Sequence, residues 1–180
     1  MKKTILSLAI TIFTLSVFAQ KKTTTSAIIS FDATTALDAL PKAENKTVVA
    51  ALDTKTGAVQ FEAVIKNFAF TNPRMQEHFN NAGWMNSDEF PSSTFNGKIT
   101  NLKDVNFSKN GTYTANVEGD LSIRGVTNKT TTKATIVVEN GKIKSSTEFS
   151  INLDDYKISA NQIIAGKVSK EPKLVVSAEF

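Results

Sequence analysis

The sequence of 180 residues contains no cysteine, one histidine and one tryptophan. The absence of cysteine excludes disulfide bonds, thiol catalysis and cysteine-ligated metals, so the fold must be held by packing and hydrogen bonding. A large excess of one charge is also missing, because 21 Lys and Arg residues against 17 Asp and Glu residues give a net charge of +4. There is no basic block and no alternation of aromatic and basic residues, so the sequence indicates no nucleic-acid partner.

A long apolar run lies at the start of the chain. It follows Lys2 and Lys3, spans residues 5–18 and ends at the small residue Ala19. This pattern is typical of a secretory signal peptide. The run is shorter than the roughly 20 residues that a bilayer core requires. We therefore expect an exported protein, periplasmic or secreted, with no stable membrane insertion after cleavage.

Cleavage after Ala19 would remove residues 1–19 as the signal peptide and leave 161 of the 180 residues. That length suits one domain with one substantial core. We expect residues 20–27 to form a flexible mature N-terminus and residues 28–180 to form the domain. The oligomeric state is not indicated by the sequence.

The apolar residues recur with a period of two, which is typical of half-buried β-strands. The clearest run begins at Tyr113 and continues to Arg124, and similar alternation recurs in four other segments. The inward positions expected from this pattern are Tyr113, Ala115, Val117, Gly119, Leu121, Ile123, Ala134, Ile136, Val138, Phe149, Ile151, Leu153, Phe95, Gly97, Ile99, Leu174, Val176, Ala178 and Phe180.

Turn signals separate these runs. Asn110-Gly111 and Asn140-Gly141 are dipeptides that favour tight hairpin turns, and Thr56-Gly57 is a weaker turn signal. One short helix is expected from Pro73 to about Asn80, capped by Asn72. Eight or nine strand-like runs with one helical insertion predict an all-β fold, either a barrel or a sandwich, and the long single-faced strands favour closure into a barrel.

The segment MQEHFNNAGW contains both the only histidine, His78, and the only tryptophan, Trp84. A metal site at His78 would need further ligands, and the nearby Glu77, Asp88 and Glu89 lack the spacing of a known site. A general base at His78 would need a nucleophile and an orienting carboxylate, and no such motif is present. The simplest interpretation is a histidine that forms local hydrogen bonds beside an aromatic cluster, which either fills a core or closes a cavity. A contact between His78 and the head group of a ligand is the remaining alternative.

Three stretches together resemble the YceI-like family of exported bacterial proteins, which is also called polyisoprenoid-binding-like. They are FEAVIKNFAFTNPRMQEHFNNAGWMNSDEFPSSTFNGKI, GDLSIRGVTNKTTTKATI and FSINLDDYKI. The positions that match the family's motifs are Phe68, Phe70, Met75, His78, Phe79, Met85, Phe90, Pro91, Phe95, Leu121, Ile123, Gly125 and Thr127. The chain differs from the family pattern in its opening strands, where many family members carry a histidine and this chain has none.

The resemblance implies a closed antiparallel, lipocalin-like β-barrel of about eight strands whose apolar cavity holds an isoprenoid-type lipid, polyprenyl or quinone-like. It implies no enzyme activity, no catalytic residues, no metal and no cofactor other than such a lipid. A solidly packed structural or interaction module and a His78-centred hydrolase remain as alternatives. The expected cavity or lid residues are Phe61, Ile65, Phe68, Phe70, Met75, His78, Phe79, Trp84, Met85, Phe95, Tyr113, Val117, Leu121, Phe149 and Ile151.

Overall fold

The computed structural model describes residues 20–159, 163 and 165–180, so the expected signal peptide, residues 1–19, lies outside the described residues. The elements are β1 (Lys21–Asp32), β2 (Lys42–Asp53), β3 (Ala58–Val64), η1 (Ile65–Asn67), β4 (Ala69–Phe70), α1 (Pro73–Asn80), β5 (Ser92–Ile99), η2 (Leu102–Asp104), β6 (Gly111–Ile123), β7 (Val126–Glu139), β8 (Lys142–Ser150), η3 (Leu153–Tyr156) and β9 (Lys173–Glu179), where η marks a 3₁₀-helix.

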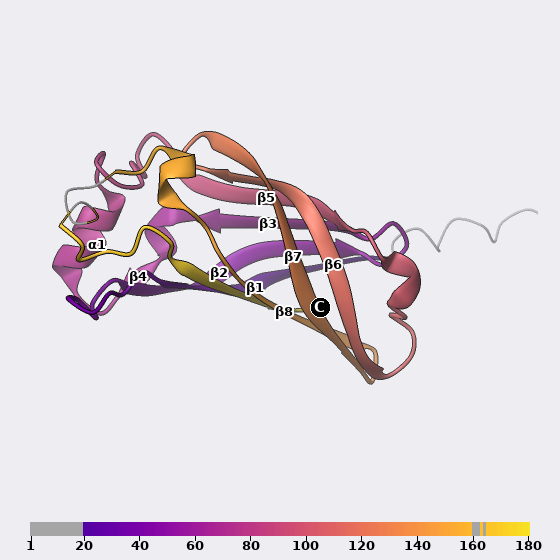
Figure 1. The fold of residues 1–180 in the computed structure, drawn as a ribbon. Coiled ribbons are helices and arrows are strands. Elements are labelled where there is room, and N and C mark those ends of the chain that lie inside the picture. Colours follow the sequence, from indigo (N-terminus) through magenta and orange to yellow (C-terminus); the bar gives the residue numbers. More distant parts are fainter. Residues whose placement is uncertain (1–19, 160–162, 164) are drawn as a thin grey trace, which may run out of the picture.

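Eight of the strands form a closed antiparallel barrel (Figure 1). The strand order is β1, β9, β8, β7, β6, β5, β3 and β2, and the barrel closes because β1 also pairs with β2. The two-residue strand β4 adds to the free edge of β2 through Ala43 and Glu44. The expected fold class, a closed lipocalin-like barrel of about eight strands with one short helix, is confirmed.

The predicted alternation places one side of each strand inside the barrel. Ala115, Leu121 and Ile123 of β6 are buried, as are Ala134, Ile136 and Val138 of the neighbouring β7. The run from Phe149 to Leu153 is partly different, because β8 ends at Ser150 and Leu153 begins η3. The buried apolar residues form two clusters, one toward each end of the barrel.

One end of the barrel is covered by α1 and the segments around it (Figure 1). The helix has the predicted bounds, and the side chain of Asn72 accepts hydrogen bonds from the backbone N–H groups of Arg74 and Met75 at 2.9 and 3.2 Å. Met75 and Phe79 are its buried residues. The chain bends at η1 before it reaches α1. At this bend the inward-facing residues change from odd-numbered to even-numbered positions. At the opposite end, η2 lies in the connection from β5 to β6.

The start of the barrel differs from the expectation. Residues 20–27 were expected to be flexible and the domain to begin at residue 28, but β1 begins at Lys21 and pairs with β2 from Lys21↔Asp53 onward. The segment is rich in threonine and lysine rather than in alternating apolar residues. Its strand conformation therefore comes from the neighbouring strand and not from a pattern of its own.

The turn predictions had mixed outcomes. Asn140 and Gly141 both have positive φ, 51° and 80°, and form the tight hairpin between β7 and β8 as predicted. The prediction of a tight turn at Asn110-Gly111 is wrong, because Gly111, at φ 159°, begins β6 after an eleven-residue connection, residues 100–110, that contains η2. The hairpin between β6 and β7 uses Arg124 and Gly125, at φ 49° and 72°, and was missed.

Two facing glycines make room for an aromatic ring inside the barrel. Gly97 of β5 pairs with Gly119 of β6, and a Cβ added at either position would come within 2.7 Å of the Phe95 ring and 2.5 Å of backbone atoms. We expect Gly97→Ala or Gly119→Ala to lower the free energy of unfolding by about 1 to 3 kcal/mol through overpacking, measured by urea denaturation. Gly83→Ala is the matched control, because an added Cβ there meets nothing within 4 Å. Equal stability of all three variants would contradict this account.

Candidate ligand cavity

An internal cavity of about 170 Å³ lies between the two apolar clusters. Its wall contains residues from both clusters, including Trp84 and Phe79 from one and Leu52 and Ile99 from the other. A void of roughly 150 Å³ lined by apolar side chains is large enough to hold one benzene molecule. The barrel is therefore not packed solid from end to end.

Aromatic rings form the wall of the cavity at the α1 end. Phe79 is the centre of this aromatic cluster, with ring centroids 5.0 to 5.8 Å from four other aromatic rings. Its partners are Phe31, Phe68, Phe70 and Trp84. Trp84 and Phe79 are 1% and 3% exposed, so the barrel is sealed at this end. The predicted cluster therefore both fills the end of the barrel and borders the cavity.

Most of the sequence-predicted site residues border this one cavity. The residues that line it are Phe61, Ile65, Phe68, Phe79, Trp84, Met85, Phe95, Val117, Leu121, Phe149 and Ile151. They come from β3, β5, β6 and β8, from η1 and α1, and from segments that follow these elements.

Four predicted residues lie away from the lining. Phe70 packs on Phe79 and Met75 lies in the core beneath α1, so both support the lining from behind. Tyr113 packs against the cluster at the opposite end, and its hydroxyl donates to the Lys109 carbonyl oxygen at 2.9 Å. His78 is a half-buried residue of α1. Among the described residues its side chain forms no hydrogen bond, unlike the local bonding expected from the sequence.

The described part of the chain contains no group of three or more His, Asp or Glu side chains that could hold a metal ion. It also contains no helix long and apolar enough to cross a membrane.

Several lining residues were missed by the sequence analysis. Ile29 and Phe31 come from β1, where no strand pattern was recognised. Val176 of β9 and Phe180, which follows β9, were expected on the inward face but were not named as cavity residues. The lining also includes hydroxyl residues, mainly from β7 and β8: Ser93, Thr94, Thr130, Thr132, Ser145, Ser146 and Thr147. The Ser93 Oγ atom is buried and has no hydrogen-bond partner among the described residues.

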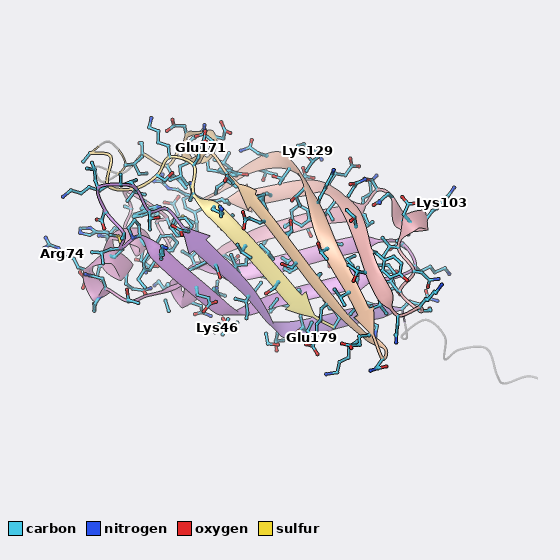
Figure 2. All side chains as sticks on the ribbon, turned by 60° about the horizontal axis from the view of Figure 1, so that its bottom comes forward. Lys46, Arg74, Lys103, Lys129, Glu171 and Glu179 are labelled. Carbon is cyan, nitrogen blue, oxygen red and sulfur yellow. The ribbon has the colours of Figure 1, made fainter. Side chains whose placement is uncertain are left out.

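Among residues 20–159, 163 and 165–180, no charged side chain lines the cavity. Figure 2 shows the labelled Lys46, Lys129 and Glu179 side chains projecting from the outer surface. Lys129 pairs with Asp120 at 2.8 Å and Lys142 with Glu179 at 3.0 Å, across neighbouring strands. Exposed pairs of this kind contribute little to stability. Among the described residues, the cavity lining is therefore apolar except for its hydroxyl groups.

The buried Tyr156 of η3 lies against β7. Burial raises the pKa of its phenol above the ordinary value of about 10, and hydrogen bonding by Thr130 and Asn128 offsets this in part. Since the folded state holds the phenolic proton more tightly than the unfolded state, this contribution to stability is complete below pH 10 and is lost as pH rises through the folded-state pKa.

We therefore expect wild-type stability to fall more steeply than that of Tyr156→Phe above about pH 10. Urea denaturation of both proteins at pH 8, 10 and 11 measures this difference. The lysines titrate in both proteins alike, so their effect cancels in the comparison. Parallel curves for the two proteins would contradict a raised Tyr156 pKa.

The fold is a closed antiparallel barrel around an apolar cavity, and the comparisons with known proteins identify its family. The profile of the YceI-like domain matches residues 10–180, so the chain belongs to the YceI-like family. No curated protein matches the chain.

Solved structures share the fold at low sequence identity. A polyisoprenoid-binding domain from Saccharophagus degradans superposes with a TM-score of 0.75 at 11% identity, covering 89% of this chain and 97% of its own. BcnA from Burkholderia cenocepacia gives 0.70 at 14% identity, covering 86% and 96%. A YceI protein from Campylobacter jejuni gives 0.55 at 17% identity, covering 98% and 92%.

Proposed function

We propose that this protein is a non-enzymatic carrier that binds an isoprenoid-type lipid inside its barrel. The observation that carries the proposal is the apolar cavity, which is bordered by residues of both clusters and, in the part of the chain that the structure describes, by no charged side chain. The membership in the YceI-like family supports the proposal. The similar fold of the Saccharophagus degradans domain, which is described as polyisoprenoid-binding, also supports it.

Burial of a branched hydrocarbon supplies the binding free energy. Each CH₂-sized group contributes about 0.8 kcal/mol, so a five-carbon unit contributes about 4 kcal/mol before the cost of association. A void of 170 Å³ is close to the size that holds one benzene ring and therefore accommodates about one such unit. A longer tail requires that lining side chains move apart, and the flexible Met85 is suited to this.

The sole tryptophan provides a direct test, because Trp84 is buried and lines the cavity. Organic extraction of the purified protein, followed by mass spectrometry, is expected to release an apolar lipid. Adding a short-chain isoprenoid quinone to the extracted protein is expected to quench Trp84 fluorescence with saturation. A Trp84→Phe variant is the signal control. The proposal would be contradicted if the purified protein carried no lipid and if neither polyprenols nor quinones changed the Trp84 fluorescence emission.

We further propose that the protein is exported, with residues 1–19 as its signal peptide and the periplasm or the medium as its destination. The charged start and apolar run of that segment support this proposal. The mass of the protein isolated from a producing bacterium is the measurement. A chain that begins at Gln20 supports export, and one that retains residues 1–19 contradicts it.

A further inference from the structure

The ladder between β7 and β8 is incomplete, and this leaves a stretch of unpaired barrel wall. The two strands pair from Glu139↔Lys142 only as far as Ala134↔Thr147. Beyond that point the first half of β7 pairs only with β6, and the last residues of β8 pair only with β9. The strands separate toward η3 (Figure 1).

Both ends of the barrel are closed, so this side gap is the best route to the cavity. The α1 end is sealed by the aromatic cluster around Phe79, and the other end by buried residues that include Leu52, Ile99 and Ile136. A second place where neighbouring strands part, between β1 and the end of β9, is closed by Ala27 and Ala178, which are 0% and 6% exposed. At the β7–β8 gap, Thr130, Thr132 and Thr147 are half-buried, and all three line the cavity.

The gap has a polar frame. At its upper limit η3 is tied to β7, because the Asn128 side chain donates to the Asp155 carbonyl oxygen at 2.9 Å. At its lower limit the hydroxyl oxygens of Thr132 and Thr147 lie 2.8 Å apart. Both threonines also line the cavity, so the gap and the cavity share this hydroxyl pair.

The protons of the pair can be assigned from the distances. The Thr147 hydroxyl donates to the Lys133 carbonyl oxygen at 2.9 Å, whereas the Thr132 hydroxyl lies 3.5 Å from the same oxygen. Because the Thr147 hydroxyl donates its one proton to the Lys133 carbonyl oxygen, the Thr132 hydroxyl is the donor in the hydrogen bond between the two threonines. Each hydroxyl has one proton and two lone pairs. The pair therefore has lone pairs left to accept a hydrogen bond and no proton left to donate.

We propose that the β7–β8 gap is the mouth of the cavity and that Thr132 and Thr147 bind the hydroxyl of an isoprenoid alcohol. This inference rests on the proposed function and adds the chemical class of the ligand's polar end. An alcohol supplies the proton that the pair can accept. A methyl ether offers no proton, and a phosphate would bring a charge to a lining whose described residues include no cation to compensate it.

The test compares three probes that share one tail: farnesol, farnesyl methyl ether and farnesyl phosphate, measured by Trp84 fluorescence. Farnesol is expected to bind about fivefold more tightly than the ether, the effect of one hydrogen bond, and at least about tenfold more tightly than the phosphate. In the Thr132→Val/Thr147→Val variant the preference for farnesol over the ether should disappear. Thr131→Val is the matched control, because Thr131 is the exposed neighbour on the same strand.

The cysteine-free chain allows a separate test of the mouth. Thr132→Cys is expected to react with a charged thiol reagent at least about tenfold faster than Ala134→Cys, which faces inward where pairing with β8 has resumed. Farnesol should protect Thr132→Cys. If both cysteines react equally slowly, the proposal that the β7–β8 gap is the mouth of the cavity is wrong.

The outcomes separate the two proposals. If all three farnesyl probes bind equally, or if Ser93→Ala rather than the double threonine variant removes the preference, the inference fails and the lipid carrier stands. If no isoprenoid probe binds, both fail together. A preference for the phosphate would also overturn the inference.

Discussion

Replacing Val176 by phenylalanine is expected to weaken binding of an isoprenoid ligand by more than about a hundredfold. Val176 lines the cavity from β9 and pairs with Ile29 and Thr147 on the neighbouring strands. A phenyl ring at this position occupies much of a void of about 170 Å³, which is close to the size that holds one benzene molecule. Excluding one five-carbon unit removes about 4 kcal/mol of burial, and 2.8 kcal/mol already corresponds to about a hundredfold.

The adjacent residue offers a matched control for this variant. Val175 belongs to the same strand but faces the outside, because neighbouring side chains of a strand point to opposite faces. Val175→Phe adds the same atoms without entering the cavity, so its affinity should stay near the wild-type value. Titrations followed by Trp84 fluorescence measure both variants. Unchanged affinity in Val176→Phe would place the ligand outside this cavity.

The barrel could be predicted from the sequence because inward and outward residues alternate along most strands. The Tyr113–Arg124 run, the α1 cap at Asn72 and the Asn140-Gly141 hairpin each carried a local signal that the fold uses. The strand β1 carried little such signal. Its residues 21–26 are held by β2, so pairing across 20 or more residues decides their conformation and a local pattern could not.

The cavity was predicted in part for the same reason. Apolar residues on inward positions were recognised, whereas Thr132 and Thr147 were not named as cavity residues. They have the same inward parity as Ala134 on β7 and Phe149 on β8, and the register of β7 against β8 brings the two threonines together. The gap in the β7–β8 ladder depends on where η3 leaves the wall, and no residue type marks that point. His78, by contrast, is prominent as the only histidine but lies away from the cavity lining.

The prediction with the largest effect on stability concerns Trp84. Its indole is 1% exposed and packs against Phe79 and Phe31, with ring centroids 5.4 and 6.4 Å away. Trp84→Ala would remove these contacts and enlarge the existing void, so we expect it to lower the free energy of unfolding by about 3 to 5 kcal/mol. For a chain of this size that corresponds to a fall in Tm of about 6 to 20 °C, measured by circular dichroism.

His78→Ala is the control from the same segment, because His78 is half-buried and its side chain forms no hydrogen bond among the described residues. We expect it to change stability by less than about 1 kcal/mol and to leave isoprenoid binding intact. A loss of ligand binding in His78→Ala would assign the histidine a role in ligand binding that its position outside the lining does not explain. Equal destabilisation by the two variants would mean that the aromatic cluster does not hold this end of the barrel closed. A large difference between them would instead show that the packing of the indole, and not the imidazole, holds this end closed.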